Sequence, residues 1–201
     1  MARPRNQTET EALQAALLLF WEKGYDRTSL ADLSKALGVG PSSIYSTFGS
    51  KADLFRKALQ RYMAEYAHFV PDMIARAPEA GAEITLKQLM RGAAELYSTK
   101  GQPCGCAVLE GGGTDRSDSS EGGNIAAEFT KALEAALVQL FKGAPKSEPL
   151  AQTPRLLAKY TLGVMRGLSQ LSRDGTPRAD LIKIADFAAG SCFVLSGSIK
   201  N

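Results

Sequence analysis

The stretch that decides the fold is TSLADLSKALGVGPSSIYSTFGSKADLF, which spans residues 28–55. Three leucines recur in its first half at helical spacing: Leu30, Leu33 and Leu37. They predict a short helix that ends at Gly38, because glycine commonly stops a helix. A second short helix is predicted over residues 42–47, since Pro41 suits a first helical turn. Two short helices joined by a glycine turn have the layout of a helix-turn-helix.

The turn between these helices makes two demands on the sequence. The backbone needs a residue that takes a positive φ, which Gly38 supplies, and the helix contact needs a small side chain, which Ser34 supplies. Apolar residues then lock the second helix to the first, and the expected set is Leu33, Leu37, Val39 and Ile44. We expect this packing to fix the direction in which the second helix projects.

The second helix is predicted to expose mainly short hydroxyl side chains and one phenol. The exposed positions are Pro41, Ser42, Ser43, Tyr45, Ser46 and Thr47. Such groups suit phosphate oxygens, base edges and thymine methyl groups in a major groove. The helix has no Arg, Asn or Gln for a bidentate base contact. Sequence discrimination is therefore expected to depend on apolar contacts, water and DNA shape.

Lys51 stands at the start of a further helix, where Ser50 and Asp53 form a capping-box pattern. A cation in a first helical turn opposes the helix dipole by roughly 0.3–1 kcal/mol. A DNA phosphate bound at this position would resolve that conflict. The alternative is an exposed lysine that solvent screens near Asp53.

Helical patterns continue outward on both sides of this motif. One helix is predicted before it, over residues 11–23, and a longer one after it, with an apolar stripe from Leu54 to Tyr66. Four more are predicted over residues 86–97, 125–141, 154–171 and 177–199. Residues 111–124 are rich in glycine and serine and predict a mobile loop, and residues 143–153 predict a second break. No stretch predicts a strand, so the expected fold class is all-α.

Composition and charge are those of a soluble globular protein. Of 201 residues, 44% are hydrophobic and 22% are charged, and the longest apolar run, Ala15–Trp21, is far too short for a membrane span. We therefore expect a cytoplasmic protein without a signal peptide or membrane segment. The net charge of +3 lies wholly in residues 1–61, which hold 9 Lys and Arg against 6 Asp and Glu. This excess fits a polyanionic partner as well as it fits a solvated helix face.

Residues 28–55 resemble the N-terminal signature of the TetR family of transcriptional regulators. The likeness comprises the Thr-Ser opening, the Gly-Val turn, the spacing from Tyr45 to Phe48 and the Ser-Lys start of the next helix, and it extends over about residues 10–60. The resemblance implies a homodimer of all-α subunits. Each subunit would have a three-helix DNA-binding head and a larger helical body that binds a small effector and forms the dimer.

On this resemblance, residues 1–49 form the helix-turn-helix domain and residues 50–201 the ligand-binding and dimerisation domain. Thr28 and Tyr45 would touch phosphates, and Lys51 would anchor its helix on the DNA backbone. The predicted DNA-binding residues are Thr28, Ser29, Pro41, Ser42, Ser43, Tyr45, Ser46, Thr47 and Lys51. The predicted ligand-binding residues are Met63, Tyr66, Met90, Tyr97 and Cys106. A plain apolar core is the alternative explanation for the methionines and tyrosines among them. Gly40-Pro41 replaces the Ser-Lys or Ser-Arg that family members often have, which leaves the operator sequence open.

The last two predicted helices are expected to form the dimer contact. Gly163 and Gly167 lie one turn apart on the first of them, and the final helix is apolar on nearly every side. A buried monomer core is the alternative explanation. Arg3 and Arg5, ahead of the first helix, are expected either to lie in an adjacent minor groove or to form a basic tail.

Cys104 and Cys106 form a close pair in the body, and three interpretations of it stay open. Buried, inert thiols are the commonest arrangement. A redox or electrophile sensor would need a depressed thiol pKa. A metal site would need more ligands, for which Cys192 and His68 are the only other soft candidates. No metal ion or cofactor is therefore predicted.

The sequence as a whole predicts a ligand-responsive, dimeric transcriptional repressor. It would bind a palindromic operator in double-stranded DNA and be released by a small-molecule effector. An enzyme is not expected, because the chain has one histidine and no Ser, His and Asp grouping. The alternatives are a thiol- or metal-responsive regulator or a thiol enzyme built on Cys104 and Cys106, and a non-specific architectural DNA-binding protein.

Overall fold

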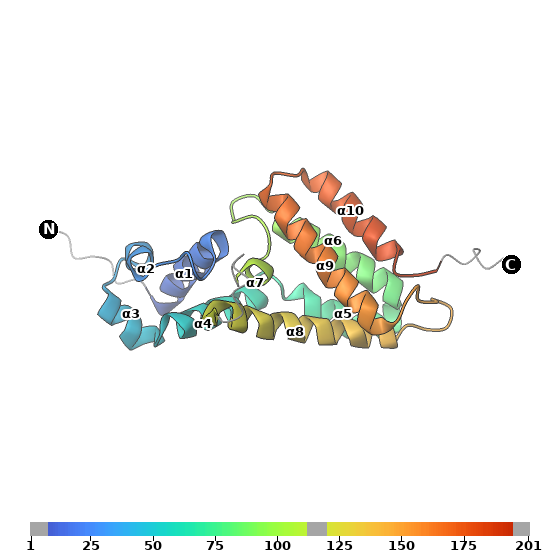
Figure 1. The fold of residues 1–201 in the computed structure, drawn as a ribbon, viewed down its shortest axis with the longest axis horizontal. Coiled ribbons are helices and arrows are strands. Elements are labelled where there is room, and N and C mark those ends of the chain that lie inside the picture. The colour runs from blue at the N-terminus through green and yellow to red at the C-terminus, as the bar shows by residue number, and fades with distance from the viewer. Residues whose placement is uncertain (1–7, 112–119, 195–201) are drawn as a thin grey trace.

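The computed structural model describes residues 8–111 and 120–194, and within these ranges the chain forms ten α-helices and no strand (Figure 1). The helices are α1 (Glu9–Lys23), α2 (Leu30–Leu37), α3 (Pro41–Phe48), α4 (Lys51–Glu65), α5 (Phe69–Ala80), α6 (Ala82–Tyr97), α7 (Ala107–Glu110), α8 (Glu121–Lys142), α9 (Pro154–Arg173) and α10 (Arg178–Gly190). The predicted all-α class is confirmed.

The helices are arranged as a small head and a larger body (Figure 1). The first three helices form one end of an elongated molecule, and α4 runs from them toward its centre. The helices α5, α6, α9 and α10 make up the other end, and α8 runs from beside α4 into it. Across the described ranges, none of these helices has both the length and the apolar character that a membrane span requires.

Aromatic side chains fix the head on α4. Phe20 of α1 meets Phe55 of α4 edge to face, with ring centroids 5.0 Å apart. Two turns further along α4, Tyr62 meets Trp21 of α1 in the same manner at 4.8 Å. Buried aromatic pairs of this kind add about 0.5–1.5 kcal/mol each beyond the area they bury. Because α4 continues into the body, the head and the body share one helix.

In the body, α6 packs against α5, α9 and α10, and α8 packs against α9. The stripe predicted on α6 is buried as expected and consists of Leu86, Leu89, Met90, Ala93 and Tyr97. The helix α5 was not predicted from sequence. Its two prolines, Pro71 and Pro78, argue against a helix, and Val70 is its only buried residue.

Two predicted boundaries are wrong. The expected loop over residues 111–124 lies partly outside the described ranges, but its last part is the first turn of α8, which Ser120 caps by accepting the Gly123 N–H at 2.9 Å. The final helix ends at Gly190 rather than Ile199. After Gly190 the chain turns back toward residue 151, and the Cys192 carbonyl accepts the Ala151 N–H at 3.0 Å. Residues 195–199, and the predicted arm with Arg3 and Arg5, lie outside the described residues.

Candidate nucleic-acid interface

The turn between α2 and α3 has the geometry that the sequence predicts. Gly38 takes a φ of +65°, in the left-handed region that favours glycine. Leu33, Leu37 and Ile44 are buried between the two helices as expected. Val39 is a correction to the expected set, because it is 36% exposed. It follows Gly38 in the turn, before α3 begins, and so lies on the rim of the contact.

Two capping boxes hold the helices on either side of α3. At the start of α2, the Ser29 hydroxyl accepts the Asp32 N–H at 3.1 Å, and the Asp32 carboxylate accepts the Ser29 N–H at 2.9 Å. Ser50 and Asp53 repeat this pattern at the start of α4, at 3.0 and 2.9 Å. Hydrogen bonds from the serine hydroxyl and N–H groups lower the pKa of Asp32 and of Asp53.

The outer face of α3 is exposed and polar. We call this surface the α3 face, and its residues are Pro41, Ser42, Ser43, Tyr45, Ser46 and Thr47. Tyr45 is its largest member, with 48% of its surface exposed. The opposite side of the helix carries Ile44 and Phe48, both buried. All six side chains predicted to face DNA from this helix are therefore accessible.

Thr28 is a correction to the predicted contact set. Its side chain is fully buried, and its hydroxyl donates to the Gly24 carbonyl at 2.6 Å. The hydroxyl is therefore used inside the head and cannot reach a phosphate in this conformation. Ser29 next to it is exposed, but its hydroxyl already caps α2.

Lys51 lies against the head. Its ammonium stands 4.1 Å from the centroid of the Tyr25 ring, a cation–π distance. Burial lowers the pKa of Lys51, and the nearby carboxylates of Asp26 and Glu121 oppose that shift. The half-buried position of Lys51 against Tyr25 therefore argues against the alternative of a fully exposed lysine. Sequence reasoning missed this cluster, because nothing in a local pattern pairs residue 25 with residue 121.

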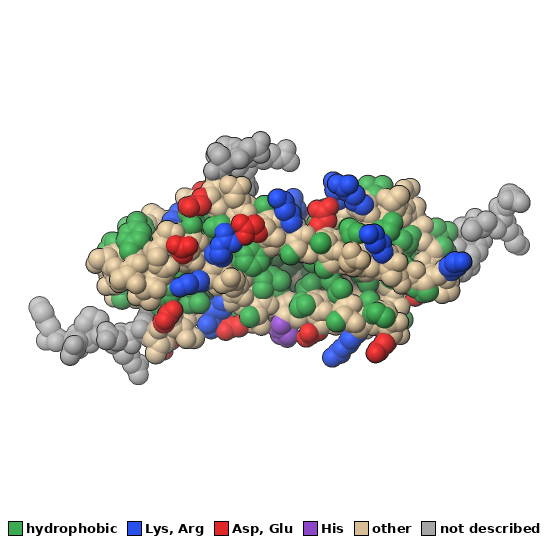
Figure 2. Space-filling view, turned by 90° about the horizontal axis from the view of Figure 1, so that it is seen from below, with side chains coloured by type: hydrophobic (Ala, Val, Ile, Leu, Met, Phe, Trp, Pro, Cys, Tyr) green, Lys and Arg blue, Asp and Glu red, His purple; other side chains and the backbone are tan. Residues whose placement is uncertain are grey.

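An apolar cavity of about 40 Å³ lies inside the body. Its walls come from α4 to α9, and its lining residues are Tyr62, Met63, Ala67, Phe69, Val70, Ala93, Leu96, Tyr97, Cys106, Val108, Leu109, Phe129, Leu133 and Met165. Figure 2 views the side of α4, α5 and α8 and shows apolar side chains gathered around a hollow in the middle of that face. No charged side chain is among the described lining residues.

Three of the five predicted ligand-binding residues line this cavity: Met63, Tyr97 and Cys106. Tyr66 does not, because it packs on Trp21 and its hydroxyl accepts a hydrogen bond from Gln14 at 2.7 Å. Met90 is fully buried elsewhere in the core. Neither residue lines this cavity, so it does not support their predicted contact with a ligand.

The two paired cysteines occupy different environments. Cys104 is exposed, whereas Cys106 is buried at the cavity wall, where its sulfur accepts a hydrogen bond from the Tyr62 hydroxyl at 3.5 Å. Burial raises the pKa of the Cys106 thiol, which is the opposite of what a reactive thiolate needs. In the described parts of the chain, no three His, Cys, Asp or Glu side chains gather as metal ligands would.

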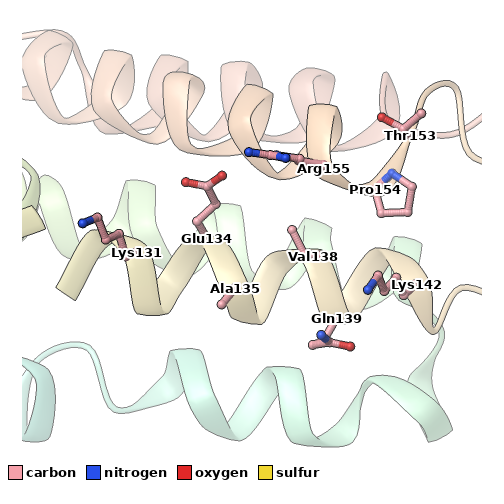
Figure 3. A pocket seen from close by; sticks show the side chains of 9 residues that line it. All are labelled: Lys131, Glu134, Ala135, Val138, Gln139, Lys142, Thr153, Pro154 and Arg155. Carbon is pink, nitrogen blue, oxygen red and sulfur yellow. The ribbon is translucent and has the colours of Figure 1, made fainter. Parts of the chain in front are cut away.

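A larger hollow of about 540 Å³ lies between the end of α8 and the start of α9 (Figure 3). It is lined by Lys131, Glu134, Ala135, Val138, Gln139, Lys142, Thr153, Pro154 and Arg155. Figure 3 shows Glu134 and Arg155 pointing toward one another across it. Charged side chains line this hollow, whereas none is among the described lining residues of the apolar cavity. We therefore take the apolar cavity as the candidate effector site.

The two C-terminal helices carry an exposed apolar surface, which we call the α9–α10 face. Its large side chains are Leu156, Tyr160, Ile184 and Phe187, of which Phe187 is 80% exposed. Gly163 and Gly167 continue the stripe on α9, and no atom lies within 4 Å of where their Cβ atoms would be. The Tyr160 and Ser191 hydroxyls lie 3.0 Å apart, which places the stripe beside the end of α10.

Known proteins match this chain both in sequence and in fold. The sequence model of bacterial regulatory proteins of the tetR family matches residues 12–58. The transcriptional repressor BdcR of Escherichia coli K12 is 32% identical over 173 residues, which cover 86% of this chain and 83% of BdcR. The repressor ComR of the same strain is 29% identical over 91% of this chain and 88% of its own length.

A solved structure gives the same result. A cysteine-substituted form of the TetR family transcriptional regulator CifR, in complex with 26-bp double-strand operator DNA, superposes with a TM-score of 0.83 at 26% identity. The match covers 95% of this chain and 100% of that chain. The fold, the helix-turn-helix and the full-length relatives therefore agree, and the chain belongs to the tetR family of bacterial regulatory proteins.

Proposed function

We propose that the protein is a dimeric transcriptional repressor that binds a palindromic operator through α3 and is released by a small effector in the apolar cavity. The observation that carries this proposal is the exposed polar face of α3 beside a buried, locked contact with α2. BdcR and ComR are named as repressors, and CifR is seen with operator DNA, which supports the same role here. Such a regulator acts in the cytoplasm, where bacterial DNA lies.

In this proposal the α3 face enters the major groove. Its serine and threonine hydroxyls reach base edges and phosphates, Tyr45 contacts a phosphate, and Lys51 binds a phosphate beside the start of α4. Ser29 stands at the start of α2 and remains within the proposed contact surface. Since the family consists of transcriptional regulators, the chain is not an enzyme, and the thiol-enzyme alternative is excluded.

The proposed dimer forms through the α9–α10 face. Phe187 and Leu156 expose large apolar surface in the single chain, and a second copy would remove it from water. Two heads joined in this way would present two copies of α3 to one side of the duplex. Their spacing would then match half-sites about 34 Å apart, or a multiple of that distance.

The proposed effector response follows from the size of the cavity. A space of about 40 Å³ is far below the roughly 150 Å³ that accommodates a benzene ring. An effector of one ring must therefore displace the walls, which include α4 and α8. Because α4 also carries the head, displacement of this helix would change the spacing between the heads of a dimer.

Selection of bound duplexes from a random pool tests the DNA-binding part of this proposal. The expected result is an enriched site with twofold symmetry and a steep dependence of affinity on salt. An enriched pool without symmetry would support the alternative of a non-specific architectural DNA-binding protein. It would contradict the proposed dimeric repressor that binds a palindromic operator.

Release of the selected duplex by uncharged, single-ring aromatic compounds tests the effector part. The variant is Ala93→Leu, which adds three carbon atoms to the cavity wall. Because these carbons exceed the free space of about 40 Å³, Ala93→Leu should displace the walls as an effector would. It should bind the duplex more weakly than the wild type without compound, and compounds that release the wild-type protein should weaken its binding no further. Release of the duplex by the compounds that persists in the variant would show that the effector binds outside this cavity.

A thiol-responsive regulator is the second candidate, because the Cys106 sulfur is part of the cavity wall. Its raised pKa argues for slow reaction with an electrophile at neutral pH. Cys106→Ser separates the two candidates when iodoacetamide is the probe. Under our proposal the variant retains release by the aromatic compounds, and iodoacetamide leaves duplex binding by the wild type unchanged. Release by iodoacetamide that depends on Cys106 would favour the second candidate.

A further inference from the structure

The start of α8 is fitted closely against Tyr25 of the head. The Tyr25 hydroxyl donates a hydrogen bond of 2.6 Å to the Glu121 carboxylate. The next residue, Gly122, lies so close to the Tyr25 ring that a Cβ there would come within 2.4 Å of it. Both contacts join residues that are far apart in the sequence. A displacement of this end of α8 would therefore disturb both contacts with Tyr25.

The same tyrosine ring holds Lys51. The Lys51 ammonium stands 4.1 Å from the ring centroid, and Glu121 and Asp26 are the anionic groups that act on it. Tyr25 thus contacts a cation with its ring and an anion with its hydroxyl. A second link between α4 and α8 lies further along both helices, where Arg56 forms an ion pair with Glu128.

We propose that Glu121 controls how available Lys51 is to DNA: in the free protein it holds the ammonium against Tyr25 and competes with an operator phosphate for it. The inference rests on the proposed function, in which Lys51 binds a phosphate. Glu121 acts here as a positioning residue, since it operates through Lys51 and touches no DNA. Its negative charge sits on the body, whereas the cation it attracts belongs to the DNA-binding surface.

The position of Glu121 links this competition to the cavity. Phe129 and Leu133 line the cavity from the same helix that begins with Glu121. Because a helix of 22 residues moves largely as one rigid element, an effector that displaces this wall also displaces Glu121 relative to Lys51. The body thereby acts on the DNA-binding surface through the charge of Glu121 and its hydrogen bond to Tyr25, in addition to the spacing of the heads.

A double-mutant cycle on the full-length protein tests the proposal. The variants are Glu121→Gln, Lys51→Met and their combination, and the measured quantity is the Kd for one operator duplex at several salt concentrations. Glu121→Gln alone should tighten binding about three- to fivefold at low salt, the range of an exposed ion pair. Lys51→Met should weaken binding and reduce the salt slope by about one unit. In the Lys51→Met background, Glu121→Gln should have no effect.

Two controls separate this competition from general effects. Glu134→Gln makes the same change of net charge on α8 outside the cluster, and it should leave the Kd unchanged. Tyr25→Phe keeps the ring under Lys51 but removes the hydrogen bond to Glu121. It should lower the Kd for the duplex, as Glu121→Gln does. Thermal unfolding of each variant confirms that the comparison is between folded proteins.

The possible outcomes distinguish the inference from the proposed function. If Glu121→Gln leaves the Kd unchanged, or tightens binding equally with and without Lys51, the competition is refuted while the operator contact stands. If Lys51→Met binds as tightly as the wild type, the proposed contact of Lys51 with DNA is itself wrong, and the competition is wrong with it.

Discussion

The α3 face and the α9–α10 face are both exposed in the single chain, yet they differ in polarity and in the size of their side chains. The α3 face carries short hydroxyl side chains and one phenol on a helix of 8 residues. The α9–α10 face carries large apolar side chains, and α9 alone has 20 residues. A polar surface is stable in water and suits a wet, charged partner such as DNA. An apolar surface of this kind calls for a partner that removes it from water.

The two faces also differ in how they are held. Only Ile44 and Phe48 of α3 are buried, so its position depends on α2 and α4 and on the capping boxes that start them. In contrast, α9 buries eight residues along one side, and Arg91 of α6 pairs with Asp186 of α10. The helix α3 is therefore a short element held by its two neighbours in the head, whereas α9 and α10 are anchored along their length in the body. The expected effect of a substitution on duplex binding therefore depends on which of the two faces carries it.

The largest effect is expected from Phe187→Glu on the α9–α10 face. The side chain is 80% exposed, so a charge there costs the monomer little. In a dimer it would place two buried charges at the interface, which opposes association strongly. A monomer has one head and binds only one half-site, so its affinity for the duplex should fall about a hundredfold. Analytical ultracentrifugation would show monomers where the wild type forms dimers.

Ile84→Glu is the matched control for this substitution. Ile84 is 53% exposed on α6, outside the α9–α10 face. The same chemical change there should leave the dimer and its affinity for duplex intact. A Phe187→Glu protein that remains dimeric would show that the apolar surface of α9 and α10 does not form the contact between subunits.

A smaller effect is expected from Tyr45→Ala on the α3 face. Its loss removes one phosphate contact, worth about 1–1.5 kcal/mol or roughly tenfold in Kd, and it should weaken binding to all duplex sequences alike. Because Tyr45 is 48% exposed, the unfolding temperature should change little. Tyr45→Phe tests the hydroxyl alone. Unchanged affinity of Tyr45→Ala at moderate salt would exclude Tyr45 from the DNA contact.

The contrast between the faces explains which features sequence could predict. The helix-turn-helix depends on local chemistry, with glycine at the turn, serine and aspartate at the caps and leucines at helical spacing, and these signals lie within 28 residues of one another. The cavity and the Lys51 cluster depend on contacts between distant segments, such as Tyr25 with Glu121. Neither the family resemblance nor helical spacing could separate Tyr66 and Met90, which lie outside the cavity, from its lining residues, and neither gave a sign that Thr28 is buried.

The smallest effect concerns the two capping boxes that hold α3 between its neighbours. The pKa values of Asp32 and Asp53 are lowered in the folded protein, so each carboxylate contributes stability above its unfolded pKa of about 4. That contribution is lost as the pH falls through the lower, folded pKa. Asp32→Asn and Asp53→Asn should therefore flatten the decline of unfolding temperature below pH 4, relative to the wild type. Part of the decline should remain in both variants. Arg91 also lowers the pKa of Asp186 in the body, so protonation of Asp186 at low pH still destabilises each variant. Equal acid sensitivity of the variants and the wild type would mean that these carboxylates do not hold the reading helix in place.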